Sequence, residues 1–226
     1  MMRRCHSRTR LLGLGLLVVT ALSMGDAHAV DAAAITMQGN GNGAAPCMAC
    51  HGADGGGQAS AGNPRLAGLD ASYLQKQLDD FASGTRASPV MQATATALSE
   101  DERAALAMYY NKLPVPDVLL KPAAAMPAAN NVGAVLATRG RWGNNVPACE
   151  QCHGPAGVGV GAHFPPLAGQ PAAYIVAQLK AWQQGTRHND PLQLMQHLSS
   201  ALSTQDIRAV ADWFAAQPLA ANGVTP

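Results

Sequence analysis

The chain has 226 residues, which is enough for one or two domains of ordinary size. Its 15 Lys and Arg residues almost cancel its 14 Asp and Glu residues, for a formal net charge of +1. This balance excludes the strongly basic surface that nucleic-acid binding requires, so we expect no nucleic-acid partner.

Residues 1–29 predict a secretory signal peptide that is not part of the fold. Four arginines lie between residues 3 and 10, an apolar run covers residues 11–21, and Ala27-His28-Ala29 forms a small-x-small cleavage site. A helix that spans a bilayer needs about 20 apolar residues, so this run is too short for a membrane anchor. We therefore predict cleavage after about Ala29 and export of a soluble chain to the periplasm.

The first chemical motif is Cys47-Met48-Ala49-Cys50-His51, a C-x-x-C-H sequence. Two thiols at this spacing can add to the two vinyl groups on one edge of a porphyrin, and the histidine that follows can then bind the iron. This is the attachment pattern of c-type haem. A glycine-rich loop over residues 52–62 comes next, and Pro64-Arg65-Leu66 follows it.

Two helices are expected after this loop. Asp70 can cap a helix that runs to about Ser83. Ser99-Glu100-Asp101-Glu102 is a capping-box signature, and apolar residues at helical spacing extend the second helix to about Leu113. Because no convincing alternating strand pattern appears, we predict an all-α fold.

Residues 113–129 are predicted to form a linker. They contain four prolines at near-regular spacing, which disfavours helix and gives a semi-rigid connection. The linker separates a first domain, residues 30–112, from a second domain, residues 130–226.

The second domain repeats the first. Leu66-Ala67-Gly68 recurs 101 residues later as Leu167-Ala168-Gly169, and ten of the 21 positions from Leu66 to Arg86 are identical at this offset. Such self-similarity indicates a tandem duplication. The second copy has its own C-x-x-C-H motif, Cys149-Glu150-Gln151-Cys152-His153, and its own proline element, Pro165-Pro166-Leu167.

We therefore predict two covalently bound haem c groups. The predicted thioether residues are Cys47, Cys50, Cys149 and Cys152. A zinc site is one alternative, but it needs further ligands, and the first copy has no other Cys or His outside its motif. A thioredoxin-like dithiol is another, but the βαβ pattern expected near it is absent.

The proline elements are predicted to support the histidines. Pro64 and Pro165 occupy matching positions, and a carbonyl from such a loop can accept the histidine N–H and fix its tautomer. Leu66 and Leu167 would then wall the haem edge. A plain loop turn is the alternative, because the pattern is short.

The second axial ligand of each iron is predicted to be methionine. Met91 and Met195 each lie seven residues before a Leu-Ser pair, so they occupy the same place in the repeat. Methionine with histidine is a standard ligand pair in cytochromes c. The predicted axial pairs are His51 with Met91 and His153 with Met195. Ordinary core methionines are the alternative.

Three further histidines of the second copy also offer nitrogen donors. They are His163, His188 and His197. None has a histidine counterpart in the first copy, so we expect them to be surface or packing residues.

Together these features resemble the dihaem cytochrome c4 family over nearly all of residues 44–216. The resemblance implies two class I cytochrome c domains, each a few helices around one haem, related by a pseudo-twofold axis. It also implies a periplasmic electron-donor role, often towards a terminal oxidase, and peripheral membrane association in some members. One departure is the short lead over residues 38–45, which leaves the first domain with a short or displaced first helix.

The favoured function is electron transfer without catalysis. Each iron is assigned a methionine. Outside the haem motifs no histidine recurs at matching positions, and no carboxylate does except the helix-cap pair Glu102 and Asp206, which disfavours a peroxidase or small-molecule dehydrogenase. Expected partners are redox proteins: a donor dehydrogenase or quinol-oxidising complex, and an acceptor oxidase or reductase. The alternative is a haem subunit that stays bound to a periplasmic dehydrogenase.

Overall fold

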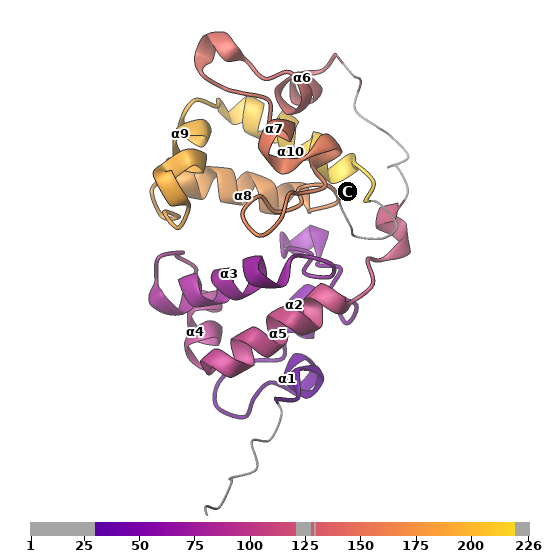
Figure 1. The fold of residues 1–226 in the computed structure, drawn as a ribbon, viewed down its shortest axis with the longest axis vertical. Coiled ribbons are helices and arrows are strands. Elements are labelled where there is room, and N and C mark those ends of the chain that lie inside the picture. The colour runs from indigo at the N-terminus through magenta and orange to yellow at the C-terminus, as the bar shows by residue number, and fades with distance from the viewer. Residues whose placement is uncertain (1–29, 121–127, 129, 220–226) are drawn as a thin grey trace, which may run out of the picture.

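The computed structural model describes residues 30–120, 128 and 130–219, so the predicted signal peptide and much of the later linker lie outside it. The described residues form helices and isolated bridges without a β-strand, which confirms the all-α prediction. Figure 1 shows two groups of helices stacked along the long axis of the molecule. We call residues 30–113 the first half and residues 130–219 the second half.

The two halves contain corresponding helices. Those of the first half are α1 (Ala32–Gln38), α2 (Met48–His51), α3 (Ala71–Ser83), α4 (Pro89–Thr96) and α5 (Glu100–Lys112). Those of the second half are α6 (Val132–Thr138), α7 (Glu150–His153), α8 (Ala172–Gln183), α9 (Leu194–Ser200) and α10 (Thr204–Ala216). Short 3-10 turns lie between them, at Ala59–Ala61, Trp142–Asn144, Pro155–Gly157 and Pro191–Gln193.

The predicted caps form at the expected helix starts. Asp70 accepts a hydrogen bond from the Tyr73 amide at 3.0 Å and begins α3, and Ser99 with Glu102 forms the capping box of α5. The second half repeats this box at α10 with Ser203 and Asp206, where the shorter aspartate replaces glutamate. Side-chain acceptors therefore satisfy backbone amides that the first helical turn leaves free.

Two expectations about irregular segments differ from the structure. Helix α1 has seven residues, as α6 has, so the first helix is not shortened, although α1 contacts α5 less extensively than α6 contacts α10. The predicted linker contains a 3-10 turn, Asp117–Leu120, because Pro116 and Pro122 leave five residues without proline between them. Before this turn, Val115 lies so close to Gly68 that a Cβ on the glycine would be 2.8 Å from it. The start of the linker is thus fixed on the first half.

The apolar cores lie around the crossing of the first and last helix of each half. In the second half, α6 approaches α10 so closely that a Cβ on Gly133 would lie 2.0 Å from the Ala209 carbonyl oxygen. The core there includes Leu136, Ile207 and Phe214, all nearly inaccessible to solvent. Only glycine permits this approach, so the helix pair is fixed by backbone contact as well as by burial.

The halves meet through α3 and α8, which face each other in the middle of Figure 1. The Ala87 amide donates to the Thr186 carbonyl at 3.1 Å, beside an antiparallel bridge between Arg86 and Arg187. These two arginines are equivalent positions of the repeat. A bridge between equivalent residues is the contact that a local twofold axis produces, and such an axis is what the resemblance to the dihaem cytochrome c4 family implied.

The Arg141–Asp206 ion pair gives a pH-dependent prediction. Two hydrogen bonds from Arg141 at 2.7 and 3.1 Å, followed by those from Ser203, lower the pKa of Asp206 to about 2. A carboxyl with a lower pKa in the folded chain stabilises it above the unfolded pKa, and this contribution is lost as pH falls from about 4 towards 2. We expect Asp206→Asn to lower the free energy of unfolding by about 1 kcal/mol at pH 7, allowing for the partly exposed arginine.

Urea unfolding at pH 7 and at pH 2.5 to 3 checks this. The difference in the free energy of unfolding between wild type and Asp206→Asn should become smaller at the lower pH. Asp212→Asn, at an exposed position on the same helix, is the control, and its free energy of unfolding should equal that of wild type at both pH values. An equal gap at both pH values would mean that the carboxylate charge contributes little.

Candidate functional site

A cavity of about 1020 Å³ extends through both halves and has mostly apolar walls. All twelve predicted site residues line it: Cys47, Cys50, His51, Pro64, Leu66, Met91, Cys149, Cys152, His153, Pro165, Leu167 and Met195. The structure therefore brings together residues that lie far apart in each copy.

The two motif histidines are buried and held in one tautomer. His51 Nδ1 lies 2.9 Å from the Pro64 carbonyl oxygen, and His153 Nδ1 lies 2.8 Å from that of Pro165. A carbonyl oxygen can only accept, so Nδ1 carries the proton and Nε2 keeps a free lone pair. Burial lowers the pKa of both histidines, against the opposite effect of the carbonyl hydrogen bond. A neutral imidazole with a free Nε2 is the form that binds a metal ion.

Glycines allow the proline loop to reach each histidine. The Gly57 amide donates to the His51 carbonyl at 2.8 Å, and the Gly159 amide donates to the His153 carbonyl at 2.7 Å. Both glycines have φ near +85 to +89°, and a Cβ on either would lie 2.7 Å from backbone atoms of the proline element. The glycine-rich loops seen in the sequence are therefore needed for close backbone approach.

The C-x-x-C-H spacing places sulfur and nitrogen donors within one helical turn. In each half the histidine amide donates to the carbonyl of the first cysteine at 2.9 Å, so residues three and four apart share a face. The four cysteines of the described chain form no disulfide. Within the described residues there is also no group of three or more His, Cys, Asp or Glu side chains arranged to hold a metal ion, so the zinc alternative lacks a ligand set there.

The two methionines reach the cavity from corresponding helices, α4 and α9. Ser88 caps α4 and accepts from the Met91 amide at 3.4 Å, whereas Asp190 accepts from the Met195 amide at 2.7 Å. The backbone before Met195 is strained, because Leu192 and Gln193 both have left-handed φ values, of 62° and 55°. The same methionine position is thus reached by two different local structures.

The three additional histidines of the second half are exposed. His163, His188 and His197 all lie at the surface, as expected. His197 follows Met195 by two residues, and its Nδ1 lies 2.7 Å from the Gln193 carbonyl oxygen. Its side chain is therefore engaged with its own helix.

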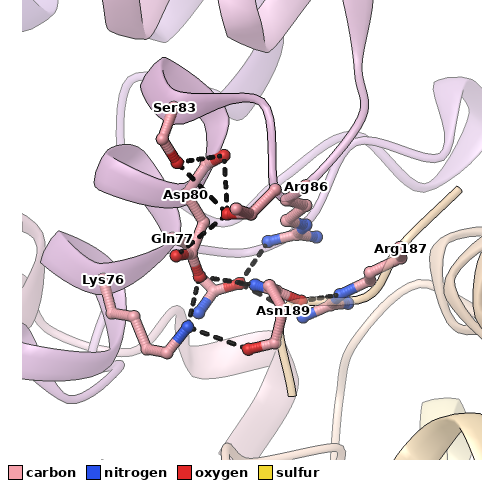
Figure 2. Close-up of polar contacts among 8 residues, drawn as sticks. Lys76, Gln77, Asp80, Ser83, Arg86, Arg187 and Asn189 are labelled. Carbon is pink, nitrogen blue, oxygen red and sulfur yellow. Dashed lines mark hydrogen bonds and ion pairs between the residues drawn. The ribbon is translucent and has the colours of Figure 1, made fainter. Parts of the chain in front are cut away.

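A buried polar cluster between the halves was not predicted. In Figure 2, the side chains of Arg86 and Arg187 lie beside Gln77. The side-chain oxygen of Gln77 accepts from both guanidinium groups, at 2.9 and 3.1 Å. Gln178, the repeat equivalent of Gln77, also accepts from both arginines, at 2.8 Å in each case. Each arginine is only 5% exposed. Equivalent residues of the two copies therefore meet in this cluster.

The outer part of the cluster is drawn in Figure 2 beside these arginines. Asn189 donates to Asp80 at 2.6 Å and to Gln77 at 3.0 Å, and Lys76 pairs with Asp80 and donates to the Asn189 carbonyl at 2.9 Å. The sequence did hold a signal for the cluster. Gln77 and Arg86 recur in the second copy, and polar side chains kept at the same place in both copies suit an interface between them.

The cavity fits the group that the motifs predict. Its walls are apolar, its thiols are unpaired, and each half offers an imidazole nitrogen and a thioether sulfur. Nitrogen and sulfur donors with few oxygen donors suit iron in a haem and do not suit a hard cation such as Mg²⁺ or Ca²⁺.

Known proteins resemble this chain along most of its length. The Cytochrome c family matches residues 39–114. A thiosulfate dehydrogenase electron acceptor of Stutzerimonas stutzeri is 54% identical over 195 residues, which cover 86% of this chain and 89% of that protein. The crystal structure of reduced cytochrome c4 from Pseudomonas stutzeri is 34% identical with a TM-score of 0.68, over 76% of this chain and 93% of that one.

A longer protein also contains a similar part. The structure of thiosulfate dehydrogenase from Marichromatium purpuratum, in its as-isolated form, is 42% identical with a TM-score of 0.75. The match covers 83% of this chain but only 40% of that one, so this chain spans less than half of that protein. Within the residues that the structure describes, no helix combines the length and apolar character needed to cross a membrane.

The glycine that supports His153 gives a testable contrast within one loop. Gly159 and Gly161 both have positive φ, but a Cβ on Gly159 would lie 2.7 Å from Pro166, whereas one on Gly161 meets nothing within 4 Å. Backbone strain from alanine costs about 1–2 kcal/mol at either site, and the clash adds about 1–3 kcal/mol at Gly159 only. We expect Gly159→Ala to lower the melting temperature clearly more than Gly161→Ala does. Equal effects in thermal unfolding would show that the loop can move away from Pro166 without loss.

Proposed function

Because this chain belongs to the cytochrome c4 family, we propose that it is the electron acceptor of a thiosulfate-oxidising dehydrogenase. The observation that carries the proposal is a difference in similarity. The chain is 54% identical to a thiosulfate dehydrogenase electron acceptor but 34% identical to a solved cytochrome c4. A similar segment also forms part of a longer thiosulfate dehydrogenase.

The coarser function follows from family membership itself. The chain is a c-type cytochrome with two covalently bound haem groups, and it transfers electrons to and from redox partners without being an enzyme. When bound, each haem supplies a one-electron couple between ferric and ferrous iron. The polypeptide attaches, orients and encloses that group.

We assign the attachment and axial roles as follows. The thiols of Cys47, Cys50, Cys149 and Cys152 form the thioether bonds. His51 and His153 bind iron through Nε2, the nitrogen left free by the Nδ1 hydrogen bonds to the proline carbonyls. These carbonyls fix the ring orientation and make the imidazole a stronger ligand. Leu66 and Leu167 cover the cofactor edge in the two halves.

Met91 and Met195 are assigned as the second axial ligands. Both line the cavity, and each belongs to the helix that precedes the last helix of its half. Support for Met195 over His197 comes from the exposure of His197 and from the contact of its ring with Gln193. A thioether ligand favours ferrous iron and raises the potential, which suits an electron acceptor.

The cellular placement belongs to the same proposal. Residues 1–29 act as a signal peptide cleaved after about Ala29, and the chain works in the periplasm. The domains span residues 30–112 and 130–226, joined by a linker over residues 113–129. Peripheral association with the membrane is part of the same proposal, because the resemblance to the family implies it for some members.

Two modes of action are open within this proposal. A free carrier would take electrons from the dehydrogenase and pass them to an oxidase or reductase. A bound subunit would stay with the dehydrogenase throughout. Co-purification of the dehydrogenase at a fixed ratio distinguishes the subunit from the carrier.

The methionine assignments are tested by single substitutions. Sulfur bound to ferric haem iron gives a weak absorbance band at the red end of the visible spectrum. Met91→Ala and Met195→Ala should each remove about half of this band and lower one of the two reduction potentials, because the thioether stabilises ferrous iron. His197→Ala is the control for the second half and should leave both unchanged. Loss of half the band in His197→Ala but not in Met195→Ala would reverse that assignment.

The partner is tested by reduction kinetics. The oxidised protein is mixed with thiosulfate and a catalytic amount of thiosulfate dehydrogenase, and reduction is followed in the visible spectrum. We expect reduction only when enzyme and thiosulfate are both present, and faster than for an unrelated cytochrome c of similar potential. Equal rates for the two cytochromes, with faster reduction by a quinol-oxidising complex, would point to the general respiratory carrier instead.

A further inference from the structure

Arg65 is a buried cation whose guanidinium group is incompletely paired. Its side chain is the largest among those that are almost completely buried, and the residue is 1% exposed. Nη1 donates to the Ala67 carbonyl, but Nε and Nη2 are buried without a hydrogen-bond partner. Buried donors are usually satisfied, so two free donors on one charged group indicate a missing partner.

The missing partner carries negative charge. No carboxylate of the described residues lies within 4 Å of the Arg65 guanidinium. An unpaired ion in a protein interior costs several kcal/mol, which water or a backbone carbonyl compensates only in part. Burial accordingly lowers the pKa of Arg65 to about 10. An anion beside Arg65 would compensate both the buried charge and the two free donors.

The position of Arg65 indicates where this anion comes from. Arg65 lines the cavity, and it directly follows Pro64, whose carbonyl accepts from His51. Haem carries two propionate carboxylates, and a guanidinium binds a carboxylate through two parallel hydrogen bonds. We propose that Arg65 binds a carboxylate of the cofactor held in the first half, an inference that rests on the proposed attachment at Cys47 and Cys50.

The backbone of Arg65 is held independently of its side chain. Gln170 of the second half accepts from the Arg65 amide at 3.1 Å and donates to its carbonyl at 3.0 Å. The contact between the halves at this point therefore uses no atom of the guanidinium. A substitution of the side chain can change the charge in the cavity while this contact remains.

The second half has no equivalent cation. Pro166 occupies the matching position between Pro165 and Leu167. In the described part of the second half, two buried side-chain N–H groups lack a hydrogen-bond partner. They belong to Trp182 and Trp213, which are neutral. A buried positive charge favours the reduced iron, which carries one positive charge fewer. Arg65 therefore raises the first reduction potential relative to the second.

The test is a redox titration of the intact two-haem protein and its variants. Arg65→Met keeps the length and apolar stem of the side chain and removes the charge, and Arg65→Gln serves the same purpose if Arg65→Met does not assemble. One potential should fall by a three- to tenfold change in its equilibrium constant, roughly 30–60 mV for one electron. Arg65→Lys should keep most of the wild-type value. Lys112→Met, which removes an exposed charge from the same half, is the control and should move neither potential.

The Met91→Ala and Met195→Ala proteins identify the two potentials. The potential that Arg65→Met lowers should be the one that Met91→Ala lowers. Unchanged potentials, equal shifts in both, or a shift confined to the potential that depends on Met195 would each overturn the proposal. A wild-type protein with fewer than two covalent haems would instead overturn the attachment on which it rests, so the two failures are distinguishable.

Discussion

The structure depends on filling one large cavity. Each half consists of short helices with small apolar cores. Several of the core residues, such as Leu106, Leu136 and Phe214, also line a space of about 1020 Å³. Apolar side chains that line such a space lack the close packing contacts that a filled core provides, and these contacts are part of what makes a small domain stable. The fold and the covalent attachment of its cofactors are therefore coupled, and each half has its observed form because a cofactor completes it.

The contact between the halves follows a different principle, since it is polar and buried. Arg86 and Arg187 are like charges, yet both donate to Gln77 and both donate to Gln178. Each guanidinium also stacks on an aromatic ring, Phe81 or Trp182, at 4.4 and 4.0 Å from its centre. Neutral amide oxygens and ring faces satisfy the donors without cancelling the charge. The centre of the molecule thus stays positive, which suits cofactors that bring carboxylates into the same cavity.

Much of this architecture could be predicted because it depends on local rules or on the repeat. Caps at Asp70 and Ser99 fix helix starts within a few residues, and the C-x-x-C-H motif fixes its own helical turn. The seven-residue α1 was not foreseen, because glycines around Gly41 mark the loop after a helix as easily as the loss of one. The arginine cluster was also missed. Its residues were visible as repeats, but a single chain does not reveal that two equivalent side chains meet across an axis. The roles of Met91 and Met195 remain predictions, although the fold brings both to the cavity.

Duplication gives the two halves the same scaffold, so any difference between the cofactors must come from positions where the copies diverge. The hydrogen bonds that hold each histidine agree within about 0.1 Å between the halves, and cannot by themselves distinguish the irons. The positions that differ between the copies lie outside the hydrogen bonds that hold the histidines. Arg65 in the first copy corresponds to Pro166 in the second. Tyr110 corresponds in packing to Phe214, since their carbonyls accept from Gly68 and Gly169 at the same 3.0 Å. A change at such a position alters charge or polarity beside one cofactor while the ligand geometry that both copies need is preserved. Two equal sites would exchange an electron without preference, whereas one buried charge on one side is enough to give the exchange a direction.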